Sequence, residues 1–177
     1  MKKIIQAAAL GFGILLSGVS DAQVTVSSPT SGNSGNDARY FRSDAATAKT
    51  AKKMEIANAR AHKDFDRKFD TKSTVSWAQD GGMILASYKE NGVTTRVTYK
   101  NNGRWFRTIK TYDGALLRKS AMKQVKAGYG KYQIKFVNEV FEPGFHCYFV
   151  SVQKEKDYKQ LIVYEGNVWI HDQFTHQ

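Results

Sequence analysis

The residues best able to do chemistry in this 177-residue chain are its single cysteine and four histidines. Cys147 directly follows His146, and a thiolate nucleophile needs a base within hydrogen-bonding reach. Both belong to an alternating apolar run, 146–154, that predicts a strand, and neighbours on a strand point to opposite faces. The pattern therefore favours a buried or half-buried thiol that packs as a small apolar side chain. A cysteine enzyme stays an alternative, which thiol reactivity would test.

The other titratable residues follow no metal-binding or acid–base motif. His171, Asp172 and His176 lie near the C-terminus without the paired histidines or cysteines of a zinc motif. The aspartates between residues 64 and 70 alternate with basic residues on a predicted helix, which is typical of local charge pairing. We therefore predict no catalytic residue, no metal and no cofactor, and we expect a protein that is not an enzyme.

The first 22 residues have the order of an export signal. A positive start precedes a mostly apolar stretch, 4–16, and small residues end the segment at Ala22. The apolar stretch is shorter than the roughly 20 residues that cross a bilayer, and no cysteine lies near the cleavage site to carry a lipid anchor. We predict a signal peptide over 1–22, no membrane span, and a periplasmic or secreted mature chain. Residues 23–43 are rich in Ser, Gly and Asn and predict a flexible linker.

The mature chain is expected to be strongly basic. Removing residues 1–22 takes two lysines and one aspartate from a net charge of +11, which leaves +10. Such a charge attracts anionic polymers and envelope surfaces, although the basic residues are spread over two predicted helices among acidic ones. Since no nucleic-acid-binding motif accompanies the charge, we expect no specific nucleic-acid partner.

Hydrophobic periodicity predicts two similar halves, each made of a helix and four strands. Apolar residues recur at steps of three and four after Ser43, a plausible N-cap, and again after Gly114. Short alternating runs follow each helix and predict antiparallel meanders. The expected fold class is α+β. A domain over 44–177 holds tandem duplicated units, about 44–112 and 113–174, each one helix followed by a four-stranded antiparallel meander, with the helices on one face of the sheets.

Turn residues separate the predicted strands. Asn91-Gly92 is the strongest hairpin signal, because a type I′ turn needs positive φ at both central residues. The two halves also close alike, one with Tyr99-Lys-Asn-Asn-Gly103-Arg-Trp105 and the other with the run 164–169, Tyr-Glu-Gly-Asn-Val-Trp. The predicted strands are 73–79, 83–90, 93–100, 104–112, 131–141, 146–154, 158–165 and 168–174.

Several of these segments have the order and spacing of a known family. They are 65–69, Val75-Ser-Trp77, Asn91-Gly92, the run 99–105 and the run 132–140, Tyr-x-Ile-x-x-Val-x-Glu-Val. Over about residues 45–174 the chain resembles the PepSY-like, β-lactamase-inhibitor-like family of exported bacterial proteins. The resemblance implies tandem helix-plus-sheet units with an open sheet face and a non-enzymatic exported protein. It identifies no inhibitory residue in this chain.

The chain departs from this family at the start of the second predicted helix. Leu116-Leu117 stands where similar proteins often have Leu-Pro. A proline in the first turn is preorganised for a helix start, so its absence leaves the first residue of this helix open.

Aromatic residues give the leading functional hypothesis. Several predicted strands are apolar on both faces, whereas helices can cover only one face of a sheet. We expect an exported non-catalytic binding module that engages a protein or peptide of the cell envelope through the open face, and that inhibits or modulates an envelope enzyme. A cationic binder of polyanions or envelope surfaces is the alternative. The same rings could instead fill the seam between the two units. The candidate binding residues are Trp77, Tyr88, Trp105, Phe106, Tyr112 and Trp169.

Overall fold

Over residues 37–175, which the computed structural model describes, the chain forms one eight-stranded antiparallel sheet and two α-helices. Side chains are described from residue 48 on, and the predicted signal peptide and most of the predicted linker lie outside the described residues. The elements in chain order are α1 (Asp37–Lys68), β1 (Ser76–Asp80), β2 (Met83–Glu90), β3 (Val93–Tyr99), β4 (Trp105–Asp113), the 3-10 turn η1 (Gly114–Leu116), α2 (Lys119–Tyr129), β5 (Gln133–Glu142), β6 (Phe145–Lys154), β7 (Asp157–Tyr164) and β8 (Asn167–Thr175).

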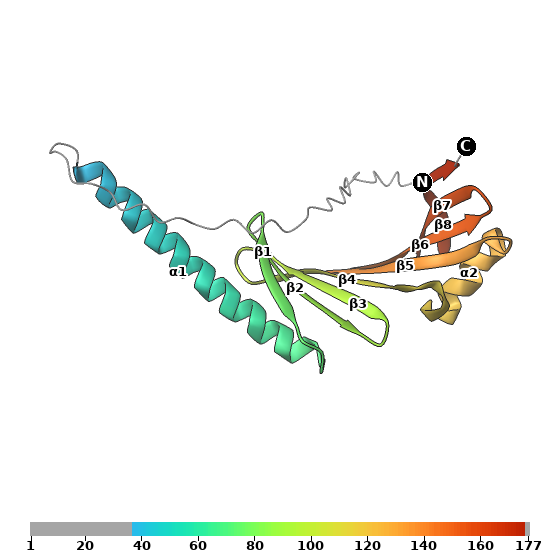
Figure 1. Cartoon of the computed structure of the whole chain (residues 1–177), viewed down its shortest axis with the longest axis horizontal. Coiled ribbons are helices and arrows are strands. Elements are labelled where there is room, and N and C mark those ends of the chain that lie inside the picture. Colours follow the sequence, from blue (N-terminus) through green and yellow to red (C-terminus); the bar gives the residue numbers. More distant parts are fainter. Residues whose placement is uncertain (1–36, 176–177) are drawn as a thin grey trace, which may run out of the picture. The chain divides into compact units, whose positions relative to one another are not determined.

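The strands follow one another across the sheet in chain order, from β1 to β8 (Figure 1). The prediction of tandem units, each with a meander of its own, is therefore wrong. β4 and β5 pair from Thr108–Phe141 to Asp113–Phe136, which joins both halves into a single, dominant sheet. Two separate meanders would leave two inner edges of unpaired N–H and C=O groups, and the pairing of β4 with β5 satisfies both edges.

The register assigns every strand residue to one of two faces, because cross-strand partners share a face. We call the face that packs against α1 and α2 the helix face, and the opposite one the open face. Both helices pack on the same side, since the register places the buried strand residues of both halves on the same face of the sheet. Across the sheet this set runs through Ala86, Val97 and Thr108, and then through Tyr112, Val137, Val150 and Leu161.

α1 covers the helix face over the first four strands. Ala57, Ala61 and Phe65 recur every four residues along one side of the helix and are at most 3% exposed. The ring of Phe65 lies 5.3 Å from that of Trp77, in an edge-on arrangement. The helix begins at Asp37, so Ser43 lies inside it and is not the N-cap predicted. The strand side of this core consists of Ile84, Ala86, Val97 and Tyr99.

α2 packs on the same face over the later strands. Leu117, Ala121 and Val125 again recur every four residues and are buried. The side chain of Asp113 accepts a hydrogen bond from the N–H of Ala115 at 2.8 Å and caps η1, and α2 then begins at Lys119. The start of the second helix is thereby settled. Its core partners on the strands include Val137, Val150, Leu161 and Val163.

Two glycine-containing turns matter for how the sheet is built. Asn91 and Gly92 both have positive φ, at 48° and 79°, which confirms the turn predicted between β2 and β3. Gly103, with φ of 74°, lies in the turn after β3, and this turn contacts α1. The guanidinium of Arg60 donates to the carbonyl oxygen of Asn102 at 3.0 Å and fastens the turn to the helix.

Candidate functional site

The open face of β5–β8 carries large apolar side chains that neither helix covers. Trp169 and Phe174 of β8 are 48% and 54% exposed, and Phe136 and Phe145 are 45% and 39% exposed. The register places all four on the open face, because successive side chains on a strand point to opposite faces. We call the whole set the aromatic patch. It consists of Phe136, Phe145, Phe149, Tyr158, Tyr164, Trp169 and Phe174.

Neighbouring rings hold one another in place across the strands of this patch. The rings of Tyr158 and Phe174 stack with centroids 5.1 Å apart, and those of Phe145 and Tyr164 lie 4.9 Å apart. A hollow of about 360 Å³ opens beside these rings, and its lining includes Phe136, Tyr158, Asp172 and Phe174. Paired rings have few alternative rotamers, so the patch loses little side-chain freedom when a partner binds.

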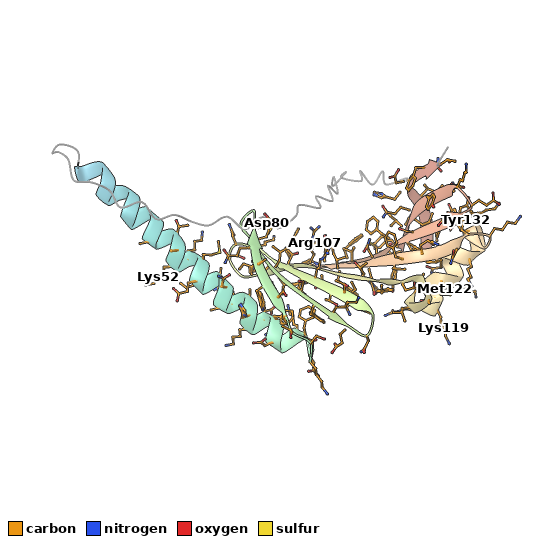
Figure 2. All side chains as sticks on the ribbon, in the orientation of Figure 1. Lys52, Asp80, Arg107, Lys119, Met122 and Tyr132 are labelled. Atoms are coloured by element: carbon orange, nitrogen blue, oxygen red, sulfur yellow. The ribbon has the colours of Figure 1, made fainter. Side chains whose placement is uncertain are left out.

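The other half of the open face is polar and basic. Arg96 of β3 is exposed opposite Ile109, and Arg107 of β4 lies opposite Thr98. Figure 2 shows Arg107 on the side of the sheet away from Met122 of α2. The open face therefore combines an apolar half over β5–β8 with a cationic half over β3 and β4.

Most of the predicted binding residues lie on the helix face. Trp77 and Tyr88 pack with the α1 core, and Tyr112 is 7% exposed with its hydroxyl donating to Glu139 at 2.9 Å. The indole N–H of Trp105 donates to the hydroxyl of Thr108 at 3.0 Å on that same face. The structure therefore gathers these four residues around the helices and leaves them little surface to offer a partner from the open side.

The remaining two predicted residues are placed differently. Phe106 lies at the irregularity in the β3–β4 pairing, half-buried, with the ammonium of Lys100 5.4 Å from its ring centroid. Trp169 lies within the aromatic patch, opposite Ile162. Sequence reasoning missed the other six members of the patch. The sequence does show that Phe149 alternates with its apolar neighbours along the strand. It does not show which of the two alternating sets of side chains faces the helices.

Cys147 and its neighbour His146 point to opposite faces of β6. The thiol is fully buried under the open face, while His146 Nε2 lies 2.8 Å from a carboxylate oxygen of Glu139 on the helix face. Burial, with a smaller contribution from the carboxylate of Glu142, raises the pKa of the Cys147 thiol to about 11. The thiol is thus protonated at neutral pH and has no histidine beside it, which argues against the cysteine-enzyme alternative.

We expect Cys147 to react slowly in the native chain. At pH 7 a chromogenic disulfide reagent should label it about 100-fold more slowly than in the guanidinium-unfolded chain, because both thiolate content and access are lower. Raising the pH from 9 toward 11 should also lower stability, since the unfolded thiol ionises first and the folded one still holds its proton. Equal labelling rates in the native and unfolded chains would reopen the cysteine-enzyme hypothesis.

Between residues 37 and 175 no three His, Cys, Asp or Glu side chains come together as a metal would require. No helix in that range has the length and apolar character of a membrane span.

The fold of this chain is shared by proteins of known structure. No family model and no curated protein matches the sequence, but solved structures share its fold. A BLIP-like protein from Bacteroides fragilis is 15% identical, with a TM-score of 0.54 over 66% of this chain and 84% of that one. A DUF2874 family protein from Bacteroides ovatus is 19% identical, with a TM-score of 0.53 over 68% and 85%. A predicted periplasmic protein from Bacteroides eggerthii is 16% identical, with a TM-score of 0.51 over 66% and 86%.

These likenesses show a BLIP-like fold and nothing finer. They support the β-lactamase-inhibitor-like part of the family resemblance and do not confirm its PepSY-like part.

Proposed function

We propose that this chain is an exported, non-catalytic binding module that engages a protein or peptide partner through the open face. The observation that carries the proposal is the aromatic patch, with Phe136, Phe145, Trp169 and Phe174 exposed together on one side of one sheet. Soluble proteins rarely leave so many large rings side by side in water unless another molecule covers them. Tryptophan and tyrosine are also the commonest energetic anchors of protein interfaces.

The charge on the same face favours a particular kind of partner. Arg96 and Arg107 lie beside the apolar half, and the mature chain is expected to carry a net charge of +10. Complementary charge accelerates encounter and fixes orientation more than it adds affinity. A protein with an apolar epitope bordered by acidic residues fits this arrangement.

The setting of the partner follows from the predicted leader and from the structural neighbours. Residues 1–22 predict export, and the neighbours include a BLIP-like protein and a predicted periplasmic protein. Both support a role in the cell envelope for a chain that performs no catalysis itself. We propose that the partner is an envelope protein, and that binding inhibits or modulates an envelope enzyme.

Affinity capture from an envelope extract tests this function. The immobilised chain is compared with Trp169→Ala, which removes an anchor from the aromatic patch, and with Ile56→Ala as the matched control. Ile56 is a large apolar residue of α1 with 54% exposure that lies outside the patch. For a partner identified by capture, we expect Trp169→Ala to weaken binding by about 30-fold, the usual effect of losing an interface anchor.

The same capture at two salt concentrations separates the alternative function. Binding of polyanions is driven by counterion release and should weaken steeply with salt, whereas binding at an apolar patch should persist. The proposal would be contradicted if Trp169→Ala and Ile56→Ala both bind the partner as well as the original chain does, and if added salt abolishes this binding. That result would favour the polyanion alternative.

A further inference from the structure

Between the areas that α1 and α2 cover, the helix face has a trough made of two cavities. The first, of about 370 Å³, is walled by Leu116 and Arg118 before α2, and its floor includes Tyr112 and Glu139. The second, of about 300 Å³, is walled by Lys68 and Phe69 at the end of α1, and its floor includes Trp105 and Phe141. Lys110 of β4 lines both cavities, so they adjoin.

Both carboxylates that line the first cavity already have partners. Glu90 accepts from the hydroxyl of Thr71 and from the N–H of Lys72, each at 3.4 Å. Glu139 accepts a hydrogen bond from the hydroxyl of Tyr112 at 2.9 Å, and His146 Nε2 lies 2.8 Å from its other oxygen. Burial, and then the carboxylate of Glu139, raise the pKa of Tyr112, so this hydroxyl keeps its proton and remains the donor. The side chain of Glu139 is only 12% exposed, and both of its carboxylate oxygens already have partners within the chain.

Of the three cations that line the trough, Lys68 pairs with Asp64 at 2.9 Å, and the other two lack such partners among the described residues. Neither Lys110 nor Arg118 forms an ion pair with a carboxylate in the part of the chain that the structure describes. Lys110 instead lies over the ring of Phe141, 5.6 Å from its centroid. A half-buried ammonium and a nearby guanidinium without acceptors favour an anion between them, since charge-assisted hydrogen bonds are the strong ones.

The other end of the trough is mainly aromatic, with the ammonium of Lys68 5.2 Å from the centroid of the Trp105 ring. Phe69, Trp105 and Phe141 line it, and the indole N–H of Trp105 is taken up by Thr108. The exposed part of this indole therefore offers its ring and not its donor. A group that fills this cavity gains by burying apolar surface.

We propose that the trough binds an amphipathic carboxylate. Its carboxylate lies at Lys110 and Arg118, and its aromatic or branched aliphatic group fills the recess of Phe69, Trp105 and Phe141. The C-terminal residue of a peptide and a free apolar acid both have this chemistry. The site lies on the side of the sheet opposite the aromatic patch, so it stands or falls independently of the proposed protein partner.

Indole N–H signals of the ¹⁵N-labelled chain test the site, with assignments from Trp→Phe variants. Titration with N-acetyl-phenylalanine should shift the signal of Trp105 and leave that of Trp169, on the open face, unchanged. N-acetyl-phenylalaninamide, which has the same ring without the charge, should bind about tenfold more weakly. Comparison with 3-phenylpropionate identifies the source: tighter binding of the acetylated amino acid indicates a peptide C-terminus, and equal binding a free acid.

Charge variants complete the test. Arg118→Gln and Lys110→Gln should each weaken N-acetyl-phenylalanine about tenfold. Lys123→Gln, an exposed lysine of α2 outside both cavities, should have no effect and is the matched control. Equal binding of acid and amide, an unmoved Trp105 signal at millimolar ligand, or equal effects of Arg118→Gln and Lys123→Gln would each overturn the proposal.

Discussion

Replacing Gly103 with alanine is expected to lower the free energy of unfolding by about 3 kcal/mol, from left-handed backbone strain and overpacking together. Gly103 has φ of 74°, and a Cβ built there would lie 2.4 Å from the carbonyl oxygen of Ala57 and 2.9 Å from the Cβ of Arg60. Both are in α1, so the helix has to move away from the sheet. Chemical denaturation followed by circular dichroism measures the loss.

Gly92 supplies the matched control for this effect. It has nearly the same backbone conformation, with φ of 79°, but a Cβ added there meets no atom within 4 Å. Gly92→Ala should therefore cost only the left-handed strain, about 1 kcal/mol. Equal losses for the two variants would show that the turn after β3 does not press against α1 as described.

The second large loss in the free energy of unfolding is expected at Leu161. Its neighbour on the same strand, Ile162, serves as the control. Leu161 is fully buried under α2 on the helix face, and Leu161→Ala should cost about 3 kcal/mol through the cavity it leaves. Ile162 is half-buried on the open face opposite Trp169, and Ile162→Ala should cost about 1 kcal/mol, as expected where the site can relax into solvent.

This pair of variants also bears on function. If the open face is uncovered in the free chain, Ile162→Ala should lower the free energy of unfolding much less than Leu161→Ala does. Losses of equal size at Leu161 and Ile162, measured by the same denaturation, would mean that the free chain already buries its open face. The aromatic patch would then be part of a core.

The function proposed depends on this asymmetry between the faces. Both helices pack on one side of the sheet. α1 contributes Ala57, Ala61 and Phe65, and α2 contributes Ala121 and Val125. Nothing in the described chain covers the other side of β5–β8, where Trp169 and Phe174 are about half exposed. The helix face therefore holds most of the core, and the open face of β5–β8 leaves large rings exposed.

The alternation of apolar residues along a strand does not predict which aromatic side chains of the candidate site are exposed. The sequence predicts four aromatic binding residues that the register places on the helix face: Trp77, Tyr88, Trp105 and Tyr112. In strands that are apolar on both sides, hydrophobicity does not tell which parity meets a helix. Only Trp169 of the predicted set lies in the aromatic patch, and Phe145 and Phe174 had no distinguishing mark in the sequence.

Local signals in the sequence predict the strands and turns of the described chain, and they predict both helices without their first residues. Alternation over 83–90 and positive φ at Asn91 and Gly92 depend on neighbouring residues alone. Local signals do not predict the pairing of β4 with β5 or which rings remain uncovered. Both depend on contacts between residues far apart in the chain. The edge strands of the two meanders pair through their backbones, and the two helices pack on the same side of the resulting sheet.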